Sequence, residues 1–82
     1  MKYDIEFKPR ATKNLRAINN DDAKKILRKI RAMENDLAGD VTSLTDFEQQ
    51  YRLRVGDYCA LFNIENDSIV IYRIKHRREV YK

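Results

Sequence analysis

The second half of the chain contains a hairpin pattern that restricts how its strands can pair. Apolar and polar residues alternate over Tyr51–Val55, and the next two residues, Gly56-Asp57, suit a tight turn. A two-residue loop places Val55 opposite Tyr58. The same register predicts the remaining cross-strand pairs: Leu53 with Ala60 and Tyr51 with Phe62 on an apolar face, and Arg54 with Cys59 and Arg52 with Leu61 on the other face.

A third strand is expected after this hairpin. Residues 65–68 have the composition of a turn, and Ile69–Lys75 follows as a strand that ends in the basic cluster Lys-His-Arg-Arg at residues 75–78. No helix is expected after that cluster. The stretch Asp40–Gln49 has no clear period, so we interpret it as a connector whose Leu44 and Phe47 dock on the core.

The first half of the chain predicts one strand and two helices. Lys2–Phe7 alternates as a half-buried strand does, and Pro9 suits the first turn of a helix that continues to about Asn19. A second helix is expected with Asn20 as its N-cap and Gly39 at its end. Its apolar stripe consists of Ala23, Ile26, Leu27, Ile30, Met33 and Leu37.

This order of elements, β-α-α-β-β-β, predicts an α+β fold. A helical hairpin packs on one face of an antiparallel-rich sheet, and the other face of the sheet stays open. A chain of 82 residues has room for one core, so residues 1–82 are expected to form a single domain.

The composition argues against several kinds of site. One cysteine and one histidine cannot supply an internal disulfide or the usual zinc ligands, so we expect no metal and no cofactor. No apolar run approaches the ~20 residues of a membrane span. The first residues, MKYDIEF, include acidic side chains where a signal peptide would be apolar. We therefore expect a cytosolic protein without a membrane partner.

The net charge of +4 is distributed unevenly along the chain. Residues 1–31 contain ten Lys and Arg against four Asp and Glu, residues 32–72 contain two against eight, and residues 73–82 contain five against one. A short basic terminus on an otherwise balanced chain indicates a local anion site, and nucleic acid is the first candidate ligand.

Arginines are the candidate ligand-binding residues of the open face. Arg52 and Arg54 lie two residues apart on one strand, and Arg77 and Arg78 follow another strand of the sheet. Several guanidinium groups can therefore converge on one groove, where their planar shape suits phosphate. The competing interpretation is a solvated face, with ion pairs to acidic neighbours such as Glu48.

Cleavage of RNA needs little more than such a groove, because the ribose 2′-hydroxyl can attack its own phosphate once the developing charge is stabilised. Candidate acids or bases are His76 and Tyr81, although a lone histidine is more often a surface residue and a tyrosine often packs its ring on the sheet. Cys59 is a weaker candidate, since a strand cysteine is usually a small, inert apolar residue. The other tyrosines are expected in the core or at its rim: Tyr3, Tyr51, Tyr58 and Tyr72.

Several stretches resemble the RelE/ParE superfamily of bacterial toxins: YRLRVGDY at residues 51–58, ALF at residues 60–62 and IVIYRIKHRREVY at residues 69–81. The opening strand with KPRA at residues 8–11 is similar to the family's N-terminal half. Resemblance to RelE implies a ribosome-dependent endoribonuclease that cuts mRNA in the ribosomal A site and inhibits translation. It also implies a cognate antitoxin, the ribosome and mRNA as partners.

The resemblance assigns roles to individual residues. It implies that Arg54, Arg77 and Tyr81 are catalytic. The implied phosphate-binding set is Arg52, Arg54, Lys75, His76 and Arg78. In the family pattern G-x-Y-R the arginine contacts the scissile phosphate, but here the pattern ends in Cys59. A weakened nuclease is therefore expected, either because Cys59 is an inactivating change or because this chain is a natural variant that uses Arg54 instead.

Two other functions stay open at this point. ParE-like proteins use the same fold to poison DNA gyrase without enzymatic activity, and they generally lack the convergent basic and tyrosine set. Arg77 and Tyr81 therefore favour the nuclease, whereas Cys59 removes part of that advantage. The third possibility is a chain kept only for partner binding through the basic outer face of the helical hairpin.

Overall fold

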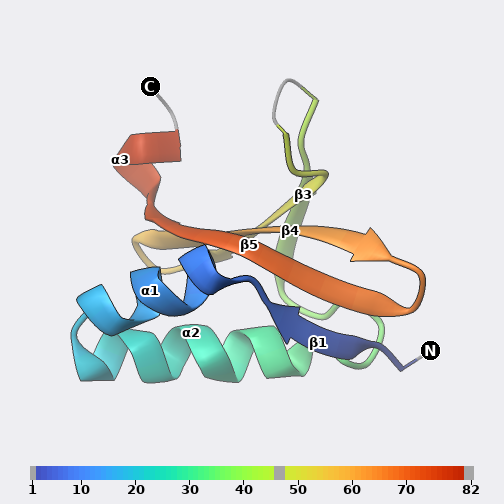
Figure 1. The fold of residues 1–82 in the computed structure, drawn as a ribbon, viewed down its shortest axis with the longest axis horizontal. Helices are drawn as coiled ribbons and strands as arrows, with labels where there is room; N and C mark the ends of the chain where they lie inside the picture. Colours follow the sequence, from blue (N-terminus) through green and yellow to red (C-terminus); the bar gives the residue numbers. More distant parts are fainter. Residues whose placement is uncertain (1, 46–47, 81–82) are drawn as a thin grey trace.

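The computed structural model describes residues 2–45 and 48–80 as a five-stranded sheet with two helices on one side and a short helix on the other (Figure 1). The elements are β1 (Asp4–Phe7), α1 (Pro9–Ala17), α2 (Asn20–Ala32), β2 (Asp40–Ser43), β3 (Tyr51–Val55), β4 (Tyr58–Glu65), β5 (Ser68–His76) and α3 (Arg77–Val80). The strand order is β1-β5-β4-β3-β2, and the predicted α+β class is confirmed.

The three central strands pair as the hairpin pattern predicts. All five predicted partners between β3 and β4 are found, from Tyr51 opposite Phe62 to Val55 opposite Tyr58. β4 and β5 are also antiparallel, joined by a two-residue turn that includes Asn66 with a positive φ of 59°. A shift of register between Leu61 and Phe62 places one extra β5 residue, Tyr72, between the partners of these two residues.

The sheet is mixed rather than purely antiparallel, because β1 runs parallel to β5. β1 is shorter than predicted, and Lys2 forms only an isolated bridge with Asn35. Beyond β1, the edge of β5 is covered by α1, where the side-chain oxygen of Asn14 accepts a hydrogen bond from the backbone N–H of Ile74 (3.0 Å). This contact satisfies a strand N–H that would otherwise lack a partner strand.

Both predicted helices form, but their ends differ from the predictions. α1 begins with Pro9 in its first turn, as expected, and ends at Ala17. The N-cap of α2 is Asn19 and not Asn20, because the Asn19 side chain accepts a hydrogen bond from the backbone N–H of Asp22 (2.9 Å). α2 ends at Ala32, well before Gly39. Leu37, the last residue of the predicted stripe, lies outside the helix, where Asp36 and Leu37 have positive φ of 60° and 54°.

The core lies between the helical pair and the sheet. Ile26, Ile30 and Met33 of the α2 stripe pack with Ala11 of α1 against the apolar face of the sheet. The buried sheet residues in this core are Leu53, Val55, Ala60, Phe62, Ile69, Ile71 and Ile74. The rings of Tyr51 and Phe62 stack with centroids 5.4 Å apart.

Two elements appear where the sequence predicts irregular structure. β2 lies in the stretch interpreted as a connector, and Val41 is its only residue that packs against the core. Its other residues are exposed, so an edge strand of this kind shows no alternation that sequence could reveal. Leu44 is half-buried but does not join the core as expected, and Phe47 lies outside the described residues.

The second unexpected element is α3, a single turn directly after β5. The prediction that no helix follows the third strand of the meander is therefore wrong. The backbone N–H of Arg77 donates to the carbonyl oxygen of Asp57 in the β3–β4 turn (2.8 Å), which attaches the start of α3 to the hairpin. No helix within residues 2–45 and 48–80 has both the length and the apolar content needed to cross a bilayer.

The cap of α2 supplies a direct test of the helix boundary. Asn19→Ala should lower the free energy of unfolding by about 1 kcal/mol, because it leaves the N–H of Asp22 without its partner. The matched control is Asn20→Ala, which removes the same side chain from an exposed helical position and should leave stability unchanged or slightly higher. Urea unfolding followed by circular dichroism measures both, and an equal loss in the two variants would contradict the assignment.

Candidate functional site: a basic sheet face

Two rows of residues cross the sheet on the face turned away from α1 and α2. In the first row, Cys59 lies between Arg54 of β3 and Lys75 of β5. In the second row, Leu61 lies between Arg52 and Arg73. Each row thus places a neutral residue on β4 between two long cationic side chains. We call these eight positions, completed on β2 by Asp40 and Thr42, the cationic ladder.

The neutral residues of the cationic ladder are buried although they face away from the helices. Cys59 is fully buried and Leu61 is 4 % exposed. Burial raises the pKa of the Cys59 thiol, and the nearby charges of Arg52 and Arg54 offset only part of this effect. The thiol is therefore protonated at neutral pH, which makes Cys59 a poor nucleophile.

A groove of about 680 Å³ runs over the β4 and β5 part of this face. Its floor contains Leu61, Tyr72, Arg73 and Lys75. Its sides come from the start of α1, from the connection before β3 and from α3: Lys8, Pro9 and Arg10, then Glu48 and Gln49, and finally Glu79. Figure 1 shows that the β2–β3 connection and α3 both project from the side of the sheet opposite the helical pair.

The β2–β3 connection is held in place beside the groove by a reciprocal pair of hydrogen bonds. The backbone N–H of Gln50 donates to the side-chain oxygen of Asn63 (2.6 Å), and the side-chain oxygen of Gln50 accepts from the backbone N–H of Ile64 (3.2 Å). Gln50, which follows the groove residue Gln49, is thus bonded to β4 through Asn63 and Ile64. The wall that includes Gln49 is therefore anchored to the same strand that forms the groove floor.

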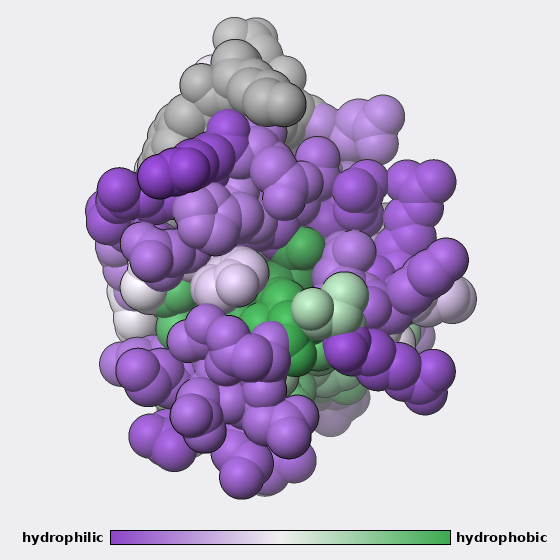
Figure 2. Space-filling model, turned by 90° about the vertical axis from the view of Figure 1, so that its left-hand side faces the viewer, coloured by the Kyte–Doolittle hydropathy of each residue, from purple (hydrophilic) through white to green (hydrophobic). Residues whose placement is uncertain are grey.

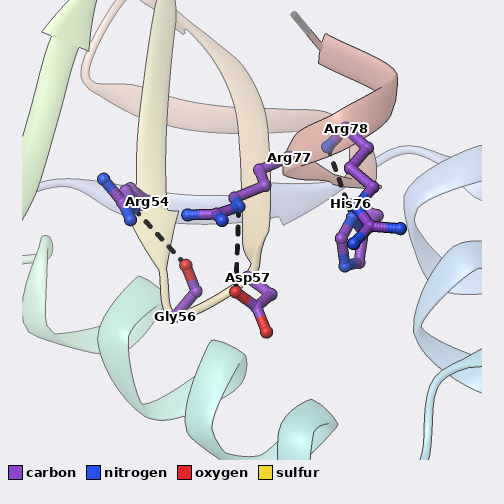
Figure 3. Close-up of polar contacts among 6 residues, drawn as sticks. All are labelled: Arg54, Gly56, Asp57, His76, Arg77 and Arg78. Carbon is purple, nitrogen blue, oxygen red and sulfur yellow. Dashed lines mark hydrogen bonds and ion pairs between the residues drawn. The ribbon is translucent and has the colours of Figure 1, made fainter.

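Arg54 and Arg77 meet at the β3–β4 turn. The Nε of Arg54 donates to the carbonyl oxygen of Gly56 (3.4 Å), and the Nε of Arg77 lies 3.9 Å from a carboxylate oxygen of Asp57. Figure 3 shows Arg77 extending from the start of α3 over this turn toward the strand that carries Arg54. Among the described residues, these contacts involve only the Nε atoms, so the terminal nitrogens of both guanidinium groups can bind an anion.

His76 and Arg78 lie on a different side of β5 from Arg77 (Figure 3). His76 is opposite Tyr58 in the register and contacts its ring edge-on, with centroids 5.5 Å apart. The His76 Nδ1 accepts a hydrogen bond from the backbone N–H of Arg78 (3.3 Å). His76 is not among the residues that line the groove, whereas Lys75 is. Tyr81 lies outside the described residues.

His76 borders a second hollow of about 280 Å³ at the end of the molecule, which shares Arg73, Lys75 and Glu79 with the groove. The structure thus brings His76 and Lys75 together in this hollow, whose other residues include Ala17, Ile18, Tyr58 and Ile74. Figure 2 shows apolar surface there, surrounded by hydrophilic side chains. This hollow lies where the helical pair meets the β3–β4 turn.

Three cationic or aromatic groove residues were not candidates from the sequence: Lys8, Arg10 and Tyr72. Arg73 was included only as part of the basic segment 73–82. Lys8 and Arg10 belong to the basic N-terminal segment, most of which lies on helix exteriors, so their charge alone did not distinguish them. Arg73 and Lys75 are two residues apart on one strand, as Arg52 and Arg54 are. This spacing places both side chains on one face of the sheet, and it was the signal in the sequence that could have identified Arg73. Tyr72 was expected in the core or at its rim, but it lines the groove and is not among the residues that pack against the core.

The residues described contain no group of three or more His, Cys, Asp or Glu side chains placed to hold a metal ion. The groove lining supplies guanidinium, ammonium, phenol and carboxylate groups.

One protein family matches nearly the whole chain. The profile of the family described as ParE toxin of type II toxin–antitoxin system, parDE, matches residues 5–81. The chain belongs to the RelE/ParE superfamily of toxins. Toxin RelE3 of Methanocaldococcus jannaschii is 34 % identical over 47 residues, which cover 57 % of this chain and 53 % of that protein. The match thus spans about half the length of this relative.

Solved structures of the superfamily have the same fold. The RelB–RelE antitoxin–toxin complex from Methanococcus jannaschii contains a chain with 27 % identity and a TM-score of 0.76, with 94 % of this chain and 95 % of that chain covered. The RelBE2 toxin–antitoxin complex from Mycobacterium tuberculosis contains one with 20 % identity and a TM-score of 0.79, with 94 % and 100 % covered. The second likeness concerns the fold alone.

The protonated state of Cys59 can be tested by alkylation. At neutral pH the native thiol should react with iodoacetamide about tenfold or more slowly than the thiol of the protein unfolded in urea, because it is buried and neutral. Since the pKa is raised in the folded state, folding gains stability from this group while the thiol is protonated. That contribution should be lost as the pH rises above about 8.5, the pKa of an unfolded thiol. Rapid labelling of the native protein would contradict this description.

Proposed function

We propose that this toxin is a ribosome-dependent endoribonuclease that cuts mRNA in the ribosomal A site and thereby inhibits translation. The observation that carries this proposal is the cationic ladder, which includes Arg54 and lies near Arg77. It lies on an open sheet face with a groove of about 680 Å³. Single-stranded RNA is bound by such combinations of cationic and aromatic side chains.

In the proposed reaction, the 2′-hydroxyl of one nucleotide attacks the adjacent phosphate, and the 5′-oxygen of the next nucleotide leaves. The protein stabilises the extra negative charge that develops on the phosphate oxygens, for which fixed cations are the most effective groups. We assign this role to Arg54 and Arg77, whose Nε contacts orient them at the β3–β4 turn. Arg52 and Lys75 then bind neighbouring phosphates.

We assign proton transfer to Tyr81 and to groups of the ribosome. Tyr81 matches the terminal tyrosine of the family and is our candidate acid, with groups of the ribosome as further donors or acceptors. Arginine is a poor base, since its pKa is above about 12. His76 and Arg78 lie away from Arg77, so we place them at RNA outside the reacting phosphate.

Cys59 occupies the position at which the family pattern supplies a phosphate-binding arginine. It lies between Arg54 and Lys75 in the cationic ladder, so an arginine there would extend among cations that a phosphate would neutralise. We therefore propose that this chain is a weakened nuclease.

A cognate antitoxin is the proposed protein partner. The similar structures from Methanococcus jannaschii and Mycobacterium tuberculosis are complexes of a toxin with its antitoxin. An antitoxin that covers the cationic ladder would block RNA by occupying the same charged surface.

The alternative proposal is a non-enzymatic inhibitor of DNA gyrase. One observation favours it: the family profile that matches residues 5–81 is that of ParE toxins. The fold by itself does not distinguish the two activities, because function depends on the site.

The identity of residue 59 gives the first functional prediction. Cys59→Arg should increase mRNA cleavage on programmed ribosomes, measured by primer extension, by about 10²- to 10³-fold. Cys59→Met is the matched control, because it lengthens the side chain without adding charge. If Cys59→Arg folds and cleaves no faster than Cys59→Met, the missing cation does not limit the activity.

Arg77 supplies the prediction that separates the two candidate functions. Arg77→Gln should reduce A-site cleavage by about 10²-fold or more, whereas Arg31→Gln on the exposed face of α2 should not change it. Supercoiling by purified gyrase should be unaffected by the wild-type protein. Inhibition of gyrase together with intact mRNA would support the alternative and exclude the nuclease.

A further inference from the structure

The groove extends well beyond the residues to which the proposed reaction assigns roles. The backbone N–H of Lys8 donates to the carbonyl oxygen of Ile71 (2.9 Å), so Lys8 is positioned beside the middle of β5. Arg77 begins α3 six residues after Ile71, and six residues of strand span about 20 Å. We call the end of the groove formed by Lys8, Arg10, Tyr72 and Arg73 the distal end. Arg73 precedes Arg77 by four residues, so the distal end begins about 13 Å along the strand from Arg77 and extends to about 20 Å.

Arg73 has a donor that points to a missing ligand. Its Nε is buried and has no hydrogen-bond partner among the described residues. Buried polar atoms of this kind nearly always have a partner, so an unpaired one at a groove indicates an acceptor that arrives with a ligand or with water. Arg73 lines the groove, and a phosphate oxygen is the acceptor that best suits a guanidinium group.

Tyr72 is held in a defined position at the same end. Its hydroxyl donates a hydrogen bond to a carboxylate oxygen of Glu65, and this bond is the main reason why the pKa of Tyr72 is raised. The ammonium group of Lys8 lies 5.7 Å from the centroid of the Tyr72 ring. Glu6 contacts the same ammonium group at 3.7 Å. The ring is thus fixed from two sides, which suits an aromatic group that packs against a base.

The charges at the groove favour RNA over an acidic peptide. Four cationic residues line it, Lys8, Arg10, Arg73 and Lys75, against two acidic ones, Glu48 and Glu79. These two lie on the β2–β3 connection and on α3. At the distal end, Glu6 and Glu65 accompany Lys8 and Tyr72, so Lys8, Arg10 and Arg73 leave an excess of one positive charge there. An aromatic ring beside closely placed guanidinium groups matches alternating bases and phosphates better than it matches a run of carboxylates.

We propose that the distal end is a separate subsite for an RNA nucleotide that flanks the cleaved one, with Arg73 and Arg10 on its phosphate and Tyr72 against its base. This inference rests on the proposed nuclease function and adds to it. The subsite determines how long an RNA segment the toxin grips, whereas Arg54 and Arg77 act on the reacting phosphate.

The test compares two lengths of uncleavable RNA. A 2′-O-methylated dinucleotide and hexanucleotide cannot react, because the attacking hydroxyl is blocked, so binding is measured without cleavage. The full chain, labelled with ¹⁵N at arginine, is titrated while the Nε–H signals are followed by NMR. The hexanucleotide should shift the Arg73 signal, whereas the dinucleotide should shift Arg54 and Arg77 and leave Arg73 unchanged.

Variants at the distal end should weaken only the longer ligand. Arg73→Met and the exposed Arg10→Met should each reduce hexanucleotide affinity by about tenfold and lower its salt dependence, with the logarithmic slope decreasing by about 0.7 per lost phosphate contact. Tyr72→Phe should retain binding, whereas Tyr72→Leu should reduce it. Arg31→Met is the control, since Arg31 is an exposed cation on α2.

The possible failures are distinguishable. If Arg77→Met weakens the hexanucleotide but Arg73→Met and Arg10→Met do not, the subsite is wrong and the proposed function stands. If neither RNA binds and the protein inhibits gyrase, both are wrong. If a hexaglutamate peptide shifts the Arg73 signal and the hexanucleotide does not, the distal end binds an acidic peptide, and the inference is overturned.

Discussion

The hydrogen-bonded register of β3, β4 and β5 determines which side chains of this toxin share a face. Because side chains alternate along a strand, a slip by one residue would send Phe62 to the groove and Cys59 to the core. The two-residue turns at both ends of β4 prevent such a slip. One set of pairings therefore produces both the apolar surface that holds the helical pair and the opposite surface with its four cations.

The cationic ladder shows how a small fold can concentrate charge. Its cations repel one another, and the buried Cys59 and Leu61 between them screen this repulsion less than water would. The repulsion is reduced by Asp40 opposite Arg54 and by Asp57 beside Arg77. A bound polyanion would lower it further, so the free surface is held in a state that favours phosphate.

Sequence reasoning succeeded where the hydrophobic pattern had a clear period and failed where it did not. The turn at Gly56-Asp57 and the alternation around it were sufficient for the complete β3–β4 register. β2 was missed because it is an exposed edge strand without alternation. α3 was missed because its start depends on a hydrogen bond from Arg77 to Asp57, twenty residues earlier in the chain. The same reason explains the site. Arg54 and Cys59 could be placed together, whereas the approach of Lys8 to Tyr72 depends on the crossing of β1 to β5.

The parallel pairing of β1 with β5 has a consequence for biosynthesis. The first strand finds its partner only in residues 68–71, which are translated long after it. Contacts between such distant segments form late and slowly compared with local helices and hairpins. A nascent chain that stalls before β5 can fold its helical pair but cannot assemble the groove floor, which needs Tyr72, Arg73 and Lys75. A nascent chain without β5 would therefore lack the surface to which we assign RNA binding.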